Sequence, residues 1–164
     1  MKSPWLLIPI LIATQAVEAR PKQRVPSLPS KGISARPPRS VDGLPIGGLP
    51  AQDLPPGKCA AFLWTTTANQ TLIAMISTDP ALIRYAPGGV VGDLARTSAM
   101  GTSKFGVATQ SSFASGTARI VAELTIVERA DITNGASIPS GILTITGNGT
   151  DSIIVPVIGL IGCG

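Results

Sequence analysis

The C-terminal stretch GILTITGNGTDSIIVPVIGLIGCG, residues 141–164, decides the fold of this chain. Two apolar runs rich in β-branched residues flank the Gly-Asn-Gly-Thr of residues 147–150. Asn and Gly accept the positive φ angles that tight turns between antiparallel strands require, so the stretch predicts a terminal β-hairpin. Pro156 stands inside the second strand and predicts an edge position or a bulge, because proline cannot donate a ladder hydrogen bond.

Upstream of this hairpin, from Cys59 onward, short runs of strand-forming residues alternate with turn signals. The expected strands cover residues 60–67, 71–77, 81–86, 90–95, 105–113 and 117–129, with a loop at 97–104 and a turn-rich link at 131–140. Turns are expected at residues 68–70, at Asp79-Pro80 and at the Pro-Gly-Gly of residues 87–89.

The clearest of these strands lies in residues 117–129, where apolar side chains recur at every second position. The apolar set is Ile120, Ala122, Leu124 and Ile126. Polar or charged residues at 119, 123 and 125 occupy the opposite face, as in a half-buried strand. A helix is the alternative, since Ala, Glu and Arg tolerate it, but the period and the β-branched residues favour a strand.

Short, regularly spaced strands without a convincing helix predict an all-β fold. The expected architecture of residues 58–164 is an antiparallel β-sandwich or a small barrel with one disulfide. The order in which the strands pair cannot be predicted from this one sequence.

The segment from Arg20 to Gly57 has a different composition and is expected to be a disordered, proline-rich, basic linker. Its nine prolines are Pro21, Pro26, Pro29, Pro37, Pro38, Pro45, Pro50, Pro55 and Pro56. A Leu-Pro pair recurs at residues 44, 49 and 54. An alternative interpretation of this segment is therefore a docking strip whose leucines enter pockets on a partner.

Residues 1–19 are typical of a secretory signal peptide. Lys2 precedes an apolar run over residues 4–13, and Val17-Glu18-Ala19 offers small residues at a cleavage site, so cleavage is expected after Ala19. An uncleaved anchor is the alternative, although the run is shorter than the roughly 20 residues that span a bilayer. The mature chain is therefore expected in the periplasm or outside the cell, with no transmembrane segment after cleavage.

The two cysteines, Cys59 and Cys163, stand at the two ends of the expected domain. In an exported protein this placement predicts a disulfide that joins the first strand to the last. A catalytic thiol or a metal ligand is the alternative, but the sequence shows no residue that would act together with either cysteine in such a role.

The charges and the missing residue types narrow the possible functions. The chain has a net charge of +4 and no histidine. Six basic residues against two acidic ones in residues 20–57 account for this charge, whereas residues 58–164 balance, so a nucleic-acid surface on the domain is not expected. Without histidine, serine–histidine and cysteine–histidine catalysis and histidine metal sites are excluded. We expect no enzyme, no catalytic residue, no metal and no cofactor.

The remaining candidate side chains fit structural roles. Glu123 and Glu128 lie five positions apart on one expected strand, so they face opposite sides and cannot act as a pair. Asp79 and Asp151 are ordinary turn residues. Trp64 could stack on a sugar or a base, but it shares a strand face with a phenylalanine, which predicts a core position.

Three motifs carry a resemblance to a known class of proteins. They are CAAFLW at residues 59–64, DLART at residues 93–97 and VPVIGLIGC at residues 155–163. The folded part thereby resembles small exported proteins of unknown function from Gram-negative bacteria. The resemblance implies an envelope location and pairing of the two cysteines, and it implies no activity. In size and β content the chain is also similar to periplasmic lysozyme inhibitors.

The expected function is a non-enzymatic cell-envelope module that binds an envelope component or a protein. The alternatives are a structural subunit of a surface assembly and a protein like the lysozyme inhibitors. The partner and the oligomeric state cannot be read from the sequence.

Overall fold

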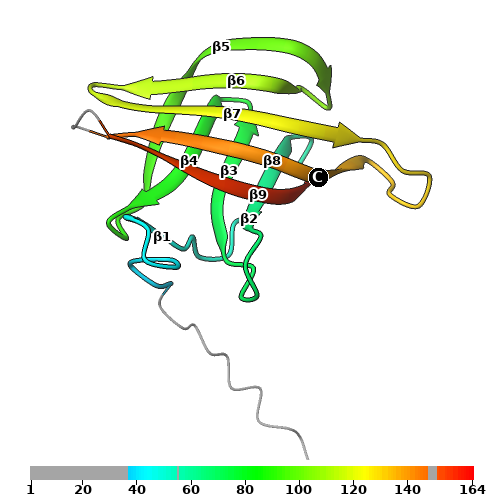
Figure 1. Cartoon of the computed structure of the whole chain (residues 1–164). Coiled ribbons are helices and arrows are strands. Elements are labelled where there is room, and N and C mark those ends of the chain that lie inside the picture. Colours follow the sequence, from blue (N-terminus) through cyan, green and yellow to red (C-terminus); the bar gives the residue numbers. More distant parts are fainter. Residues whose placement is uncertain (1–36, 55, 148–150) are drawn as a thin grey trace, which may run out of the picture. The chain divides into compact units, whose positions relative to one another are not determined.

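Eight antiparallel strands close into a barrel, and a short additional strand pairs with one of them (Figure 1). The computed structural model describes residues 37–54, 56–147 and 151–164. The strands are β1 (Ile46–Gly47), β2 (Cys59–Thr65), β3 (Leu72–Thr78), β4 (Ala81–Pro87), β5 (Gly92–Lys104), β6 (Val107–Ser115), β7 (Ala118–Val127), β8 (Gly135–Thr146) and β9 (Ser152–Cys163). No helix occurs within these described ranges, so the expected all-β class is confirmed.

Each barrel strand pairs with the next along the chain, and the ladder between β2 and β9 closes the ring. Because the pairing of β4 with β5 leaves no break between two sheets, the fold is a barrel and not a sandwich. No helix in the described part of the chain is long and apolar enough to cross a membrane.

Side chains fill the barrel interior. The largest fully buried ones are Phe113, Leu63, Ile73, Ile76, Ile83, Ile120, Ile138, Leu143, Ile161, Val107 and Val157. They come from strands all round the ring because every second residue of each strand points inward. Gly159 leaves room for Leu63, whose Cδ2 would lie 2.9 Å from a Cβ at that position. The interior is therefore a packed core.

Several strand predictions are confirmed. Residues 118–127 form a strand whose inward positions are those of the predicted apolar set. The terminal hairpin is β8 and β9, paired from Thr146↔Ser152 onward, while residues 148–150 of its turn lie outside the described ranges. Gly88 and Gly89 have positive φ angles in the turn after β4, as the Pro-Gly-Gly signal requires.

Two predicted loops are instead strands. Residues 97–104 extend β5, although they are small, polar and exposed, because they pair with β6 over most of this length. Residues 135–140 open β8 through pairing with the end of β9, and Pro139 falls at the irregularity between Ile138 and Gly141. Neither segment has an apolar periodicity that could reveal a strand, so pairing alone decides its conformation.

Strand β9 is not an edge strand as a whole, because it has β2 on one side and β8 on the other, but the predicted edge position holds locally at Pro156. The ladder between β2 and β9 ends at the pair Thr65↔Val157. Pro156, the residue before Val157, therefore has a partner only on β8, where it lies opposite Ile142. The proline thus stands where β9 has only one neighbour, which is locally the condition that the missing N–H demands.

The expected linker over residues 20–57 is wrong in its described half. Val41 and Ile46 are buried in the main core at one end of the barrel, and β1 pairs with β4. Leu49 is buried on the outer face of the barrel, where its N–H donates to Leu72 O at 2.7 Å. Proline excludes a helix or a central strand here, but not extended chain packed on a sheet. The predictions for residues 1–36 lie outside the described ranges.

The predicted disulfide between Cys59 and Cys163 is confirmed. The two residues lie directly opposite each other on β2 and β9, with Cα atoms 4.1 Å apart. Cys163 N–H donates to Asn134 O on the other side, so the cysteines occupy a non-hydrogen-bonded pair, in which strands approach most closely. The bridge joins the first and last strands of the ring.

Candidate functional site

The outer face of β9 is apolar from Ile154 to Leu160, unlike the outer face of β7. Side chains on the outside of this barrel normally alternate with the core and are polar, as Arg119, Glu123 and Thr125 are on β7. Large apolar residues at outward positions are Ile154, Pro156, Ile158 and Leu160 on β9, with Ile142 on β8 and Trp64 on β2. We call these six residues the apolar stripe.

Exposure and pairing make the stripe continuous. Ile154 is 66% exposed and Leu160 is 48% exposed, which is unusual for large apolar side chains in strands. Trp64 lies opposite Ile158 in the ladder, and Ile142 lies opposite Pro156. A contiguous exposed apolar patch of this kind marks an interaction surface in soluble proteins.

One end of the stripe is concave. A hollow of about 530 Å³ is lined by the apolar side chains of Trp64, Pro139, Ile158 and Leu160 and by the polar side chains of Gln70, Arg129 and Ser137. Arg129 donates to both carboxylate oxygens of Asp131 at 2.9 Å, and this bonding lowers the pKa of the Asp131 carboxyl. Asp131 compensates the charge of Arg129, so the hollow has mainly apolar walls, to which Gln70 and Ser137 add uncharged hydrogen-bonding groups.

The predicted core position of Trp64 is wrong. Its ring lies 6.3 Å from that of Phe62, so the two aromatic residues do share a strand face. That face is the outer one, because Ala61, Leu63 and Thr65 occupy the inward positions of β2. Strand periodicity shows which residues share a face but not which face points inward.

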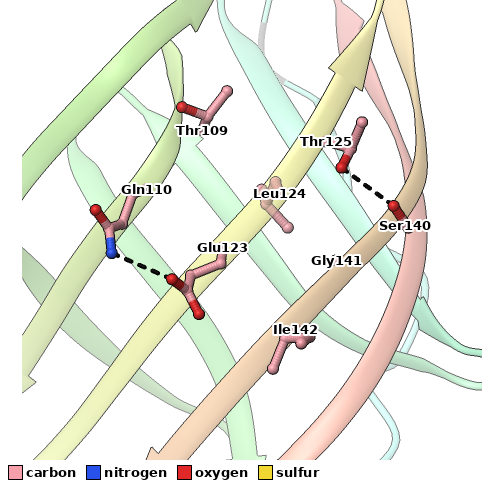
Figure 2. Close-up of a pocket in the computed structure, with 8 residues that line it drawn as sticks. All are labelled: Thr109, Gln110, Glu123, Leu124, Thr125, Ser140, Gly141 and Ile142. Carbon is pink, nitrogen blue, oxygen red and sulfur yellow. Dashed lines mark hydrogen bonds between the residues drawn. The ribbon is translucent and has the colours of Figure 1, made fainter.

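A second, polar hollow of about 420 Å³ lies beside β6, β7 and β8 (Figure 2). The ladder between β6 and β7 begins only at Gln110↔Glu123, so Thr109 has no partner pair on β7. Two side-chain hydrogen bonds border the opening, from Gln110 Nε2 to Glu123 Oε1 at 3.3 Å and from Ser140 Oγ to Thr125 Oγ1 at 3.1 Å. The polar side chains at the opening already form hydrogen bonds with one another, and Glu123 is the one carboxylate among the residues that line the hollow.

The carboxylates singled out from the sequence are separate in space. Glu123 borders the polar hollow, whereas Glu128 follows the end of β7 and forms an ion pair with Lys104 at 3.1 Å. Asp79, at the turn after β3, forms an ion pair with Lys58. No cluster of three metal-ligating side chains exists in the described residues. The one tyrosine, Tyr85, is buried in the core, and burial raises its pKa.

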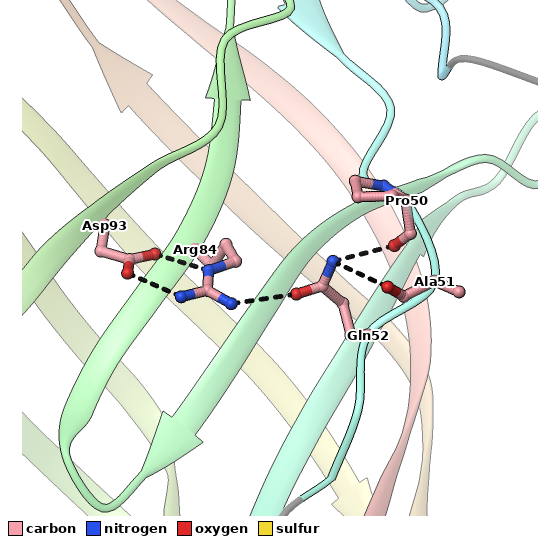
Figure 3. Close-up of polar contacts among 5 residues, drawn as sticks. All are labelled: Pro50, Ala51, Gln52, Arg84 and Asp93. Carbon is pink, nitrogen blue, oxygen red and sulfur yellow. Dashed lines mark hydrogen bonds and ion pairs between the residues drawn. The ribbon is translucent and has the colours of Figure 1, made fainter.

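A hydrogen bond from Arg84 attaches Gln52 and its neighbours to the barrel (Figure 3). Arg84 on β4 donates to both carboxylate oxygens of Asp93 on β5, at 2.8 and 2.9 Å. Its third nitrogen donates to Gln52 Oε1 at 3.3 Å, and Gln52 Nε2 donates to Pro50 O at 2.9 Å. Hydrogen bonding from Arg84 lowers the pKa of Asp93.

Replacement of Arg84 by Gln should loosen this attachment at neutral pH and have no effect in strong acid. The pair is partly exposed, so we expect a loss of about 0.5–1 kcal/mol in the free energy of unfolding. Because the pKa of Asp93 is lowered in the fold, this contribution is present above the unfolded value near 3.9 and disappears as the pH falls through the folded value. Urea unfolding of wild type and variant between pH 2 and 8 measures the difference.

The matched control for this prediction is Arg129→Gln, which removes a similar bidentate pair from the exposed link after β7. The control should leave proteolysis within residues 48–54 unchanged, whereas Arg84→Gln should accelerate it. A stability difference that persists undiminished at pH 2 would contradict the assigned role of Asp93.

The sequence contained a signal for the apolar stripe that the strand predictions did not use. Residues 153–161 read IIVPVIGLI, an almost unbroken apolar run, while residues 117–129 alternate. An unbroken run predicts a strand covered on both faces. Comparison of the chain with protein-family models, with curated proteins and with solved structures gave no match.

Proposed function

We propose that this protein is a non-enzymatic binding module of the cell envelope, and that the apolar stripe is its binding surface. The observation that carries the proposal is the apolar outer face of β9. A strand with one face in the core normally presents polar side chains to water, and β9 presents isoleucine, proline and leucine. Such an apolar face is shielded from water when a partner binds over it.

The exported location is part of the same proposal. The N-terminal residues carry the pattern of a secretory signal with cleavage after Ala19. The bridge between Cys59 and Cys163 supports it, because disulfides persist in oxidising compartments and are rare in the cytosol.

Site-specific photo-crosslinking in living cells tests the binding surface. A photoreactive phenylalanine analogue at Leu160 should give adducts of higher mass. The same analogue at Val90, an exposed residue of the turn between β4 and β5 away from the stripe, should give none. Equal crosslinking at the two positions, or none at Leu160, would refute the stripe as the binding surface.

A second candidate is a structural subunit of a surface assembly, and the edge of β5 favours it. Only residues 92–95 of β5 pair with β4, so the strand from Thr97 to Lys104 has β6 alone as its neighbour. An unpaired edge is a template for adding another strand. Sedimentation of the mature protein should show ordered oligomers under this alternative, with crosslinks from Met100, and a monomer under the main proposal.

A further inference from the structure

The apolar stripe continues a face that the chain already covers with its own residues. Residues 48–54, which we call the covering segment, lie over the outer face of β2, β3 and β4. Leu49 and Leu54 of this segment pack in a second apolar cluster outside the barrel. The barrel side of the cluster consists of Ala60, Met75, Ala86, Phe62 and Leu72.

Phe62 connects the covered and the uncovered parts of this face. It packs against the cluster under the covering segment, lies opposite Leu160 in the ladder, and has its ring near that of Trp64. Leu54 reaches the same boundary, since its Cδ2 would lie 3.8 Å from a Cβ at Gly162 of β9. The covering segment therefore ends where the stripe begins.

The covering segment shows what kind of chain this surface accepts. It is extended and joins no long strand, and its leucines supply the buried apolar area. Pro50 removes one backbone donor, and the carbonyl of Pro50 accepts from the Gln52 side chain, so the segment can lie on the sheet without ladder pairing. The leucine side chains thus supply the packing on this face, and Gln52 adds a hydrogen bond from Arg84.

The hollow of the stripe has the matching chemistry. Trp64 supplies an aromatic wall, and Ile158 and Leu160 supply apolar walls. Proline-rich extended segments bind aromatic-lined grooves because they are already ordered before binding and lose little entropy. The compensated pair of Arg129 and Asp131 gives no preference for a charged ligand.

We infer that the stripe binds an extended, uncharged Leu-Pro segment of a partner protein, in the way that the barrel binds its own covering segment. This inference rests on the proposed binding function. A second copy packed face to face fits less well, because two convex barrels meet along a line. A stable interface needs about 1,200–2,000 Å². An extended segment can follow the curvature instead.

A peptide probe tests the inference directly. The peptide GLPAQNLPPG, which copies residues 48–57 with Asn in place of Asp53, should bind the full mature protein with a dissociation constant on the order of 100 μM. Binding should shift the indole N–H signal of Trp64 in NMR spectra. Leu160→Ser should weaken binding at least about tenfold. Val90→Ser is the matched control and should leave binding unchanged, and a peptide with both leucines replaced by serine should not bind.

Three outcomes would overturn the inference. Binding that Leu160→Ser does not weaken would place the peptide elsewhere. A dimer that Leu160→Ser dissociates, with no peptide bound, would make a second copy the occupant. Absence of peptide binding while crosslinks from Leu160 persist in cells would leave the proposed function standing and refute the Leu-Pro partner alone.

Discussion

A variant with Cys59 and Cys163 both replaced by serine should lose about 2–5 kcal/mol in the free energy of unfolding. The bridge spans 104 residues, and the chain-entropy account gives about 4.7 kcal/mol for a closed loop of roughly that length. It also joins the two strands at which the ends of the chain meet to close the ring. Guanidinium unfolding, followed by tryptophan fluorescence, measures the loss.

Wild-type protein unfolded under reducing conditions is the control for this variant and should show the same lowered midpoint. The terminal hairpin should not unfold by itself, although it stands at the end of the chain. Strand β9 lies between β2 and β8, so its release would open the barrel and expose the core. An unchanged midpoint, or a separate early transition of residues 141–164, would contradict this account.

A chain that begins at residue 58 should be less stable by at least about 4 kcal/mol than a chain that begins at residue 37. Ile46 and Leu49 are buried, and loss of one such side chain typically costs about 2–5 kcal/mol. Removing the segment also exposes Met75 and opens the end of the barrel that Val41 helps to close. Thermal unfolding of the two truncated chains measures the difference.

Single substitutions distinguish the effect of losing one buried side chain from the effect of shortening the chain. Leu49→Ala should lower the free energy of unfolding by about 2–4 kcal/mol in the chain that begins at residue 37. Val90→Ala, in an exposed turn, should change it by less than about 0.5 kcal/mol. If the chain that begins at residue 58 melts at the same temperature as the longer one, the buried positions of Ile46 and Leu49 contribute nothing measurable.

Local signals in the sequence were sufficient for the class of fold. The period-two pattern around Ile120 and the turn glycines at residues 88 and 89 depend on neighbours within a few positions, and the structure confirms both. The cysteine pair is confirmed as well, since two cysteines at the ends of one domain leave a single possible connection. These features are visible in the sequence because the physics behind them is local.

Features that depend on distant partners could not be assigned correctly in this way. The exposed residues 97–104 form a strand because β6 supplies their hydrogen bonds, and Pro156 is tolerated in an inner strand because β2 ends beside it. The proline-rich residues before the barrel pack against it because the outer face of β2 to β4 is apolar. The amino-acid composition of these residues, taken alone, is typical of a linker.

By itself, the sequence determined that this chain is an all-β, disulfide-linked domain, because strand periodicity, turn residues and cysteine number act through local geometry. Only the tertiary structure decided that the sheet closes on itself, and that Trp64 and Leu160 face outward together. Side-chain alternation defines two faces of a strand, but pairing around the ring determines which face becomes the core. The candidate binding surface is the apolar face that remains outside after this pairing.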